Sequence, residues 1–424
     1  MTREMKDSGI EWIGKIPANW EMLRTKHKYT NHKDVAGDDA GDYERLALTL
    51  GGVIKRPKDD ATGLQPEAFN GYQILRKNEL VFKLIDLANV STSRVGYSPY
   101  TGIVSPAYIV LTPRNEYESK FGVYFFLSMW QRKIFNHMGD DGVRSSLNAS
   151  DLLNVPYPSV SHDEQKRIVQ FLDRKCAEID SVIADTQHTI EEYKKLKQSI
   201  ITEAVTKGVR GKRPMKYSGF EWLGDIPADW KVAPLKFSIK WKSEKGAPNE
   251  QVLSLYRDYG VIPKDSRDDN HNVTSLDTSG YKVVDVGDFV INKMKAWQGS
   301  MAISNYRGII SPAYHVCKVT NSKIDLKYFH HLMRNQLYVP EYLRLSTGMR
   351  IGQWDLGFDD FKNLPFILPS IEEQHEIVEF IESQTIEIEK LITAKEQLLT
   401  ELESYKKSVI YEYVTGKKEV PVCQ

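Results

Sequence analysis

Two long stretches of the chain repeat apolar residues at steps of three and four, which is the spacing of one face of an α-helix. The first stretch begins after Ser161 and the second after Ser370, and each would extend roughly 65 Å over about 45 residues. A glutamate follows each serine by three residues, at Glu164 and Glu373. This spacing predicts a capping box, in which the serine and glutamate side chains satisfy free N–H groups at the helix start.

The apolar residues of each predicted helix form one continuous seam, which is typical of packing against another helix. The seam positions are Ile168, Leu172, Ile179, Ile183 and Ile190 in the first helix and Ile377, Ile381, Ile388, Ile392 and Leu399 in the second. Thr186 and Lys395 interrupt the seams at equivalent places, and Gly208 and Gly416 mark the predicted helix ends. A domain of ordinary size cannot cover seams this long. We therefore expect the helices to pair antiparallel, with packing of each on its own domain as the alternative.

A mixed region precedes each long helix, with short apolar runs separated by Gly, Pro and Asn. These runs predict strands at 79–85, 102–111, 288–294 and 308–319 and shorter helices at 121–135 and 326–337. The Gly-Val-Ile segments at residues 52 and 260 are expected to form turns. Short strands together with separate long helices predict an α+β fold.

The chain is an internal duplication. Residues 5–20 recur as 215–230, with 11 of 16 positions identical at an offset of 210. Further matches follow in the same order, pairing 52–60 with 260–269, 102–110 with 308–316, 155–173 with 364–382, and 197–208 with 406–417. A period near 209 is far too long for a solenoid repeat, so the sequence contains two copies of one whole module.

Composition narrows the class of protein. The 424 residues are 41% hydrophobic, as in a globular chain, and 57 basic residues balance 57 acidic ones. Zero net charge argues against a polyanion-binding surface over the whole molecule, although a local basic face remains open. The three cysteines form no C-x-x-C pair, which argues against a disulfide framework or a cysteine zinc site. A charged N-terminus and the lack of long apolar runs predict a soluble, cytoplasmic protein.

Motifs for catalysis and for cofactor binding are missing. The sequence has no P-loop, no G-x-G-x-x-G after a predicted strand and no H-E-x-x-H. Ser-Pro-Ala-Tyr occurs twice, at 105–108 and 311–314, and resembles the [DNS]-P-P-[YFW] motif of amino-methyltransferases. Both copies lack the second proline and a preceding cofactor loop, so we interpret them as strand starts. The pair His330–His331 lies in a predicted helix, where we expect it on the surface or in the packing rather than as a ligand.

In its ordered set of motifs the chain resembles the specificity subunit of type I restriction–modification systems over essentially its whole length. Each motif is weak alone, but two copies of all of them in order are specific. The motifs are G-x-I-P-x-x-W at 14–20 and 224–230, G-I-[VI]-S-P-A-Y at 102–108 and 308–314, P-x(8)-E-Q-x-x-I-V-x-F at 156–171 and 365–380, and the ends E-A-V-T-K-G at 203–208 and E-Y-V-T-G at 412–416.

The resemblance implies two α/β target-recognition domains related by a pseudo-twofold axis and separated by two antiparallel coiled-coil helices. The implied boundaries are 1–160 and 211–370 for recognition, and 161–210 and 371–424 for the helices. Each domain would read half of a bipartite, asymmetric site in double-stranded DNA. Two modification subunits, and in some systems restriction subunits, would dock on the helices. The chain would then bind no cofactor, since S-adenosylmethionine, ATP and Mg²⁺ would bind to those partners.

The charge distribution indicates where DNA contacts lie. Residues 291–350 contain nine basic and two acidic residues, a surface suited to phosphates, although a solvated basic face is the alternative. The expected phosphate contacts are Lys55, Arg56, Lys58, Lys293 and Arg344, together with Arg144 and Arg350, which both copies share and which could equally belong to the scaffold.

Residues that read bases should differ between the copies if the half-sites differ. The divergent stretch before each Ser-Pro-Ala-Tyr is therefore the expected location of base contacts, although an ordinary polar loop remains open for any single residue. The candidates are Asn89, Ser91, Arg94, Tyr97, Lys295, Trp297 and Gln298, with Asn148 and Gln353 as secondary ones. Two other classes stay as alternatives: a self-contained DNA adenine methyltransferase, and an architectural or regulatory DNA-binding protein.

Overall fold

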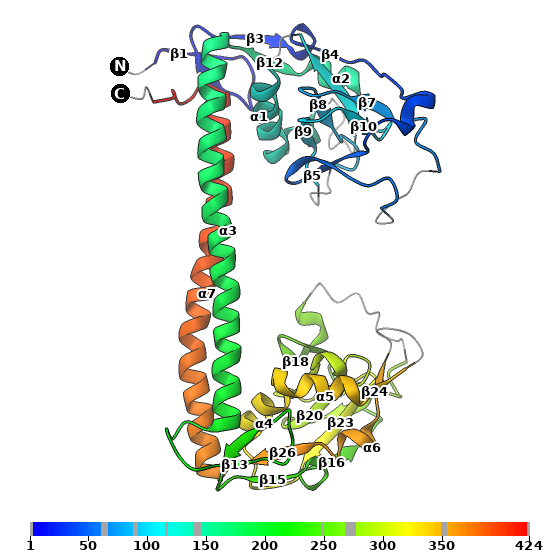
Figure 1. Ribbon diagram of the computed structural model, residues 1–424, viewed down its shortest axis with the longest axis vertical. Helices are drawn as coiled ribbons and strands as arrows, with labels where there is room; N and C mark the ends of the chain where they lie inside the picture. Colours follow the sequence, from blue (N-terminus) through cyan, green and yellow to red (C-terminus); the bar gives the residue numbers. More distant parts are fainter. Residues whose placement is uncertain are drawn as a thin grey trace. The chain divides into compact units, whose positions relative to one another are not determined.

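The computed structural model describes residues 3–60, 67–87, 92–114, 118–138, 146–247, 249–267, 277–348 and 354–421 (Figure 1). The chain divides into two compact units. Unit 1 comprises residues 1–186 and 397–424, and unit 2 comprises residues 187–396. Each unit therefore contains one mixed region, half of the first long helix and half of the second.

Unit 1 opens with a small hairpin that leads into the core through the buried Trp20. Its main sheet has the order β4-β11-β8-β9 and lies against α1, whose Phe121, Phe125 and Phe126 are fully buried. The elements are β1 (Met5–Asp7), β2 (Lys15–Pro17), β3 (Glu21–Arg24), β4 (Tyr29–Thr30), β5 (Leu46–Thr49), β6 (Gly52–Lys55), β7 (Gln73–Leu75), β8 (Leu80–Phe82), β9 (Val95–Tyr97), β10 (Gly102–Val104), β11 (Ile109–Pro113), α1 (Glu118–Gln131), α2 (Ala149–Asn154) and β12 (Pro156–Ser159).

Unit 2 repeats this plan. Its main sheet has the order β16-β23-β20-β21, which matches the order in unit 1 strand for strand, and its opening hairpin ends at the buried Trp230. The elements are β13 (Met215–Tyr217), β14 (Asp225–Pro227), β15 (Lys231–Pro234), β16 (Ile239–Lys242), β17 (Leu253–Tyr256), β18 (Gly260–Pro263), β19 (Lys282–Val284), β20 (Asp288–Asn292), β21 (Met301–Ile303), β22 (Gly308–Ile310), β23 (Tyr314–Val319), α4 (Leu326–Met333), α5 (Val339–Arg344), β24 (Ser346–Thr347), β25 (Asp355–Leu356), α6 (Phe358–Phe361) and β26 (Pro365–Leu368).

The two long helices are confirmed as α3 (His162–Lys207) and α7 (Ile371–Val414), with 46 and 44 residues. Gly208 and Gly416 follow them with φ values of 76° and 70°, the left-handed conformation expected just beyond a helix end. Among the predicted seam residues, Ile183, Ile392 and Leu399 are half-buried. The other seam residues, Ile168, Leu172, Ile179, Ile190, Ile377, Ile381 and Ile388, are buried.

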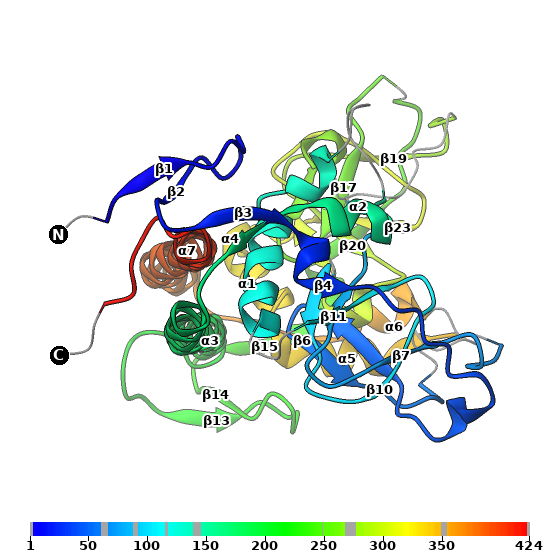
Figure 2. The ribbon, with the colours of Figure 1, turned by 90° about the horizontal axis from the view of Figure 1, so that it is seen from above.

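Within each unit, α3 and α7 lie side by side and run antiparallel (Figures 1 and 2). In unit 1 the rings of Phe171 and Tyr413 are 4.4 Å apart, and Lys406 Nζ donates to both carboxylate oxygens of Asp180 at 2.6 and 2.7 Å. In unit 2 Lys197 Nζ donates to Glu389 Oε1 at 2.5 Å. Along these contacting pairs the residue number falls in α7 as it rises in α3, so the two helices are antiparallel.

The structure corrects the interpretation of Ser-Pro-Ala-Tyr as a strand start. In unit 1 the motif forms a turn between β10 and β11, whereas in unit 2 the turn after β22 leads directly into β23, which begins at Tyr314. The amide of Tyr108 donates to Ser105 O and that of Tyr314 to Ser311 O, each at 3.1 Å. Proline has no N–H for the strand ladder, and the serine hydroxyl accepts from the backbone two residues later instead. Gly-Val-Ile, expected as a turn, begins strands β6 and β18.

The predicted shorter helices are shifted. Segment 121–135 is α1 followed by a 3₁₀ turn at Ile134–His137, and segment 326–337 ends as an α-helix at Met333. Asn335 explains the second difference, because its side chain accepts from the amide of Leu337 and starts a separate 3₁₀ turn. The capping box also differs. Ser370 does accept from the amide of Glu373, but the glutamate carboxylates bind elsewhere.

Candidate nucleic-acid interface and helix junctions

Three basic candidates of unit 1, Lys55, Arg56 and Lys58, lie on β6 and the segment after it. Lys55 is exposed, with Nζ 5.5 Å from the centre of the Tyr100 ring. Arg56 Nε donates to Asp60 Oδ2 at 2.7 Å, and Lys58 Nζ donates to the carbonyl oxygens of Ala40 and Gly41, both at 2.8 Å. Of the three residues, Lys55 is therefore the best placed to meet a phosphate.

Arg94 requires a correction, because its side chain is fully buried and points away from solvent. Its guanidinium donates to the backbone carbonyl of Asp86 at 2.7 Å and to Thr92 Oγ1 at 3.1 Å. Burial lowers the pKa of this guanidinium, partly offset by the charge of Asp86. Arg94 therefore binds Asp86 and Thr92 and, buried in this way, does not present a group to a base.

Two further candidates of unit 1 have structural roles. Asn148 is the N-cap of α2, where Oδ1 accepts from the amide of Asp151 at 3.0 Å and the Asp151 carboxylate accepts in return. This capping box accounts for Asn148 without a DNA contact. The hydroxyl of Tyr97 donates to Asn78 Oδ1 at 2.5 Å while its ring remains half-buried. Asn89, Ser91, Arg144, Arg350 and Gln353 lie outside the described residues.

Four candidates of unit 2, Lys293, Lys295, Trp297 and Gln298, lie in or next to the 3₁₀ turn at Ala296–Gln298, which follows β20. Lys295 and Gln298 are exposed, and the indole rings of Trp297 and Trp354 meet edge to face with their centres 5.1 Å apart. Lys293 Nζ lies 3.2 Å from an oxygen of Asp355. A rigid aromatic pair flanked by an exposed amine and an exposed amide is a suitable surface for base edges and phosphates.

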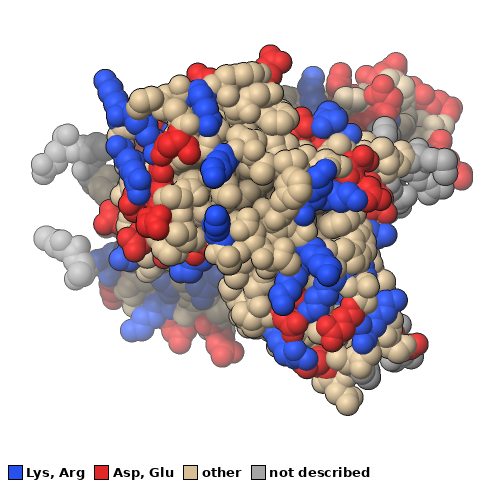
Figure 3. All heavy atoms as spheres, turned by 90° about the horizontal axis from the view of Figure 1, so that it is seen from below, with Lys and Arg blue, Asp and Glu red and all other residues tan. Residues whose placement is uncertain are grey.

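Arg344 lies on α5 and forms an ion pair with Glu341, whose Oε2 accepts from Nε at 2.9 Å and from Nη2 at 2.7 Å. Other basic residues of 291–350 are paired as well, including Arg307 with Glu250 and Lys327 with Glu382. Figure 3 shows Lys and Arg side chains mixed with Asp and Glu on the visible face. Several basic side chains of residues 291–350 are therefore paired with carboxylates of the same unit.

A cluster that the sequence did not single out surrounds the half-exposed Trp241 of β16. Lys282 Nζ lies 5.2 Å from the centre of the Trp241 ring, and the His315 ring is 4.7 Å from it. Burial lowers the pKa of Lys282, and the nearby charges of Lys293 and Lys245 lower it further. Burial also lowers the pKa of His315, with a smaller contribution from Lys282. A largely buried amine therefore packs beside an accessible aromatic ring.

Lys282 also has an equivalent in unit 1 with the same contacts. Its Nζ donates to the carbonyl of Tyr314 at 2.6 Å, and Gln73 Nε2 donates to the carbonyls of Ser105 and Tyr108 at 2.9 and 2.5 Å. Both side chains are buried and brace the Ser-Pro-Ala-Tyr turn. The offset of 209 between Gln73 and Lys282 could have revealed this pair, but unlike residue types concealed the shared role.

A second site joins the opening hairpin of unit 1 to the start of α3. The indole Nε1 of Trp20 donates to Glu164 Oε2 at 2.9 Å, and Arg3 Nη2 lies 2.6 Å from Glu164 Oε1. The Arg3 guanidinium is also 5.3 Å from the centre of the Trp20 ring. Glu164 therefore binds the hairpin and not the first turn of its own helix, as a capping box would require.

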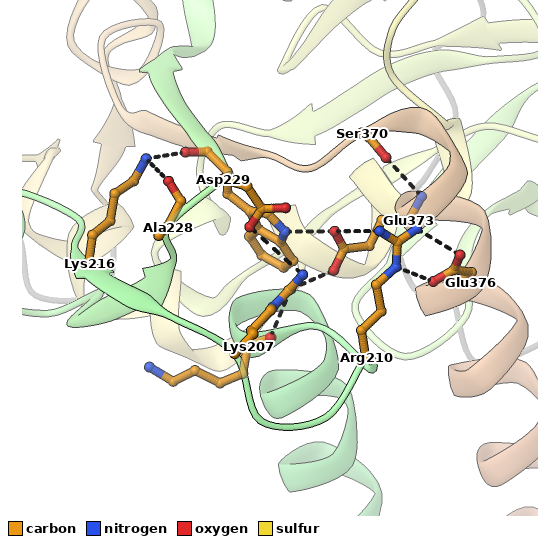
Figure 4. Close-up of polar contacts among 10 residues, drawn as sticks. Lys207, Arg210, Lys216, Ala228, Asp229, Ser370, Glu373 and Glu376 are labelled. Carbon is orange, nitrogen blue, oxygen red and sulfur yellow. Dashed lines mark hydrogen bonds and ion pairs between the residues drawn. The ribbon is translucent and has the colours of Figure 1, made fainter.

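Unit 2 forms the same junction with equivalent residues (Figure 4). Trp230 Nε1 donates to Glu373 Oε2 at 3.0 Å, Arg213 Nη2 donates to Glu373 Oε1 at 2.5 Å, and Arg213 lies 5.2 Å from the Trp230 ring centre. Glu373 is fully buried, so both partners are needed to compensate its charge. A Cβ on Gly208 would lie 3.1 Å from Trp230 and closer still to Arg213, so the helix end must be glycine here.

One further contact of unit 2, shown in Figure 4, has no equivalent among the described residues of unit 1. Arg210, just beyond α3, donates from Nε and Nη2 to the two carboxylate oxygens of Glu376, both at 2.7 Å. At the matching place in unit 1, Arg3, Arg167, Phe171 and Glu419 help to line a cavity of about 500 Å³. The two junctions thus share a core of Trp, Glu and Arg and differ at their edges.

The described residues contain neither a metal-binding cluster nor a membrane-spanning helix. No three His, Cys, Asp or Glu side chains come together in a way that could hold a metal ion. No helix is long and apolar enough to cross a membrane.

Comparisons with known proteins identify the family. A model described as the type I restriction modification DNA specificity domain matches the chain twice, at residues 29–192 and 227–403. The MjaVIII specificity subunit of Methanocaldococcus jannaschii is 23% identical over 96% of this chain and 94% of its own length. The EcoKI specificity subunit of Escherichia coli is 25% identical over 87% of this chain and 82% of its own length.

Solved structures support the same fold. A chain from a study of complex assembly and conformational transition of the type I R-M system matches with a TM-score of 0.69, at 15% identity over 95% of this chain and 99% of that one. The HsdS subunit of Thermoanaerobacter tengcongensis matches with a TM-score of 0.50, at 15% identity over 97% and 100% of the two chains. With two matches to the domain model covering most of its length, the chain belongs to the type I restriction–modification DNA specificity family.

Proposed function

We propose that this chain is the DNA-reading subunit of a type I restriction–modification complex and that each unit reads one half of a bipartite, asymmetric site. The observation that carries the proposal is one fold formed twice with different side chains at equivalent loops. The strand order is the same in both units, whereas the sequence between β8 and β9 of unit 1 differs from the sequence between β20 and β21 of unit 2, which contains Lys295 and Gln298. Shared scaffolds with divergent loops are what two different half-sites require.

In unit 2 the proposed DNA surface consists of Lys295, Gln298 and the Trp297–Trp354 pair, extended by Trp241. Exposed Lys and Gln side chains offer the donors and acceptors that distinguish base edges in the major groove. The exposed Lys245 and the half-buried Lys293 lie close enough to Lys282 for their charges to act on it, and we assign phosphate binding to these two lysines. Lys293 could contribute once DNA phosphate competes with Asp355 for its ammonium group.

In unit 1 the proposed contacts centre on Lys55 beside Tyr100. Arg56 and Lys58 lie next to it but bind carboxylate or carbonyl oxygens of the same unit. Asn89, Ser91 and Arg144 of unit 1, and Arg350 and Gln353 of unit 2, remain candidates on the sequence alone. This division assigns recognition to residues 1–160 and 211–370.

Residues 161–210 and 371–424 form the proposed spacer, an antiparallel coiled coil under a pseudo-twofold relation of the two copies. The antiparallel contacts between α3 and α7 inside each unit support this arrangement. The exposed faces of the helices are the proposed docking surface for two modification subunits and, where present, restriction subunits. S-adenosylmethionine, ATP and Mg²⁺ would bind those partners, and the complex would act on DNA in the cytoplasm.

The chain itself is a non-catalytic specificity subunit, as its relatives are. This family membership favours DNA recognition over a self-contained methyltransferase, and the Ser-Pro-Ala-Tyr motif has a structural role as a braced turn. An architectural DNA-binding protein would not need partner subunits that methylate DNA.

Mapping modified adenines across the host genome, with and without this gene, tests the proposal. We expect one bipartite methylated motif to disappear on deletion and to return when the gene is restored. A methylation pattern that is unchanged by deletion, in a host that expresses the modification subunit, would contradict it.

A further inference from the structure

The ion pair between Arg210 and Glu376 joins the end of α3 to the start of α7 within unit 2. Nε and Nη2 of Arg210 each donate at 2.7 Å to a different carboxylate oxygen of Glu376. This is the two-pronged geometry in which an arginine binds one carboxylate. The pair raises the pKa of Arg210, through its hydrogen bonds to Glu376, and lowers that of Glu376 for the same reason. Arg210 therefore recognises the helix start that carries a glutamate here.

The start of α3 carries the opposite charge at the equivalent position. Aligning E-Q-K-R-I-V at 164–169 with E-Q-H-E-I-V at 373–378 places Arg167 where α7 has Glu376. Other ion pairs between the two helices do not reverse in this way. Lys197 with Glu389 and Lys406 with Asp180 are equivalent pairs at an offset of 209, with the same signs in both units.

This difference bears on which helices can pair. The first module is synthesised before α7 exists, and its seam of apolar residues could pair with the α3 of a second chain. In such a pair Lys197 of one chain could meet Asp180 of the other. These charges are opposite, so they would not prevent two α3 helices from pairing. Arg210 would meet Arg167, and like charges at this distance repel.

We propose that Arg210 directs the pairing of the two copies, favouring α7 of the chain over α3 of a second chain because Glu376 is replaced by Arg167 there. The surface that discriminates between partners is the start of each long helix, and in the native chain it pairs with the other module. The competitor that it rejects is a second copy of this protein. This role concerns assembly of the chain and does not rest on the proposed DNA recognition.

Arg167 offers a direct test because its native contacts are few. Its side chain is exposed at the rim of the unit 1 cavity, and no ion pair holds it among the described residues. Arg167→Glu leaves the Arg210–Glu376 pair in place, while it gives Arg210 an attractive partner in a second α3. Lys166→Glu is the matched control, since it makes the same charge change on the same turn at a neighbouring exposed position.

The experiment co-expresses the full-length chain with two different affinity tags and measures the fraction captured in mixed-tag complexes after unfolding and refolding together. Each α3–α3 pair contains two such contacts, and exposed pairs contribute little individually, so we expect a rise of about tenfold for Arg167→Glu. Lys166→Glu should match the wild type. Equal mixed-tag fractions for Arg167→Glu and the wild type would overturn the proposal.

A second set of variants separates this effect from general damage. Arg210→Glu with Glu376→Arg keeps an attractive native pair, but the carboxylate introduced at position 210 also attracts Arg167, so mixed-tag complexes should increase. Adding Arg167→Glu to this pair restores like charges, and the mixed-tag fraction should return to the wild-type level. A further increase in the triple variant would show that misfolding, and not charge recognition, produces the complexes, and would also overturn the proposal.

Discussion

At the scale of single residues, one glutamate at the start of each long helix joins that helix to the opening hairpin of its unit. Glu164 and Glu373 accept from the indoles of Trp20 and Trp230 and from the guanidinium groups of Arg3 and Arg213. A buried carboxylate that loses one of its partners is costly, because its charge is then only partly compensated. These residues therefore fix how the opening hairpin meets the helix.

Trp230→Phe should lower the free energy of unfolding by about 1–3 kcal/mol, because the buried Glu373 loses an N–H donor while most of the ring packing remains. Urea unfolding followed by circular dichroism measures this loss. Trp297→Phe is the control, since its indole donates at 3.2 Å to a carbonyl in an exposed turn, and it should change stability by less than about 0.5 kcal/mol. Equal losses in both variants would contradict the role of the junction.

Lys282→Gln should be tolerated, because Gln73 braces the equivalent turn in unit 1. The variant also has a predicted pH dependence. The folded state lowers the pKa of Lys282 below its usual 10.5, so folding opposes its charged form, and this cost is fully present at neutral pH. The wild type should therefore gain stability relative to Lys282→Gln as pH rises from 7 toward 10. Urea midpoints at both pH values check this trend, and a constant difference would contradict it.

Lys55→Ala should weaken DNA binding by the assembled complex and reduce the salt dependence of binding by about one counterion. The reason is that Lys55 is exposed beside Tyr100, whereas Lys58 is held by two carbonyl oxygens. Lys58→Ala should leave the slope of log Kd against log salt unchanged. Binding titrations between low and physiological salt measure both, and identical slopes for Lys55→Ala and the wild type would exclude this contact.

At the scale of elements, periodicity predicted the long helices well because one face must stay apolar over many turns. It could not predict the strand interruptions at Ser105 and Ser311, where the lack of a proline N–H and a serine turn override an apolar run. The spacing of Ser161 and Glu164 likewise fits a capping box, but tertiary bonds to Trp20 take the carboxylate. Local pattern cannot show which distant side chain competes for a group.

The same limit applies to the candidate site. Charge and chain position selected Lys55, Lys295 and Gln298, which are exposed, but also Arg94, which is buried against backbone carbonyls. Sequence alone does not distinguish a basic side chain that faces solvent from one that is buried. Trp241 and Lys282 escaped notice because they come together only when β16 and β19 are brought near each other.

Lengthening the spacer helices α3 and α7 should alter the distance between the two DNA half-sites and leave the base sequence of each half-site unchanged. Four residues inserted at equivalent positions of α3 and α7 add about 6 Å of helix, which corresponds to one or two base pairs of DNA. Mapping of methylated adenines in a host carrying this variant measures the gap. A methylated motif with altered bases and an unchanged number of base pairs between its halves would contradict the spacer role of the helices.

At the scale of the whole molecule, the zero net charge results from basic segments and acidic segments that cancel. Residues 291–350 carry an excess of seven positive charges, whereas α7 begins with Glu372, Glu373 and Glu376, a favourable arrangement at a helix N-terminus. Much of the positive excess is used in ion pairs, such as Lys327 with Glu382. The chain alone should therefore bind DNA weakly and depend on partner subunits for much of the phosphate contact.

The central claim is that each unit reads its own half-site. Lys295→Ala with Gln298→Ala, introduced into unit 2 alone, tests it most directly when methylated adenines are mapped across the genome of a host that expresses the complete complex. We expect one half of the bipartite motif to require fewer or different bases, while the other half and the gap between the halves stay unchanged. Equal changes in both halves, or an unchanged motif at full methylation, would contradict it.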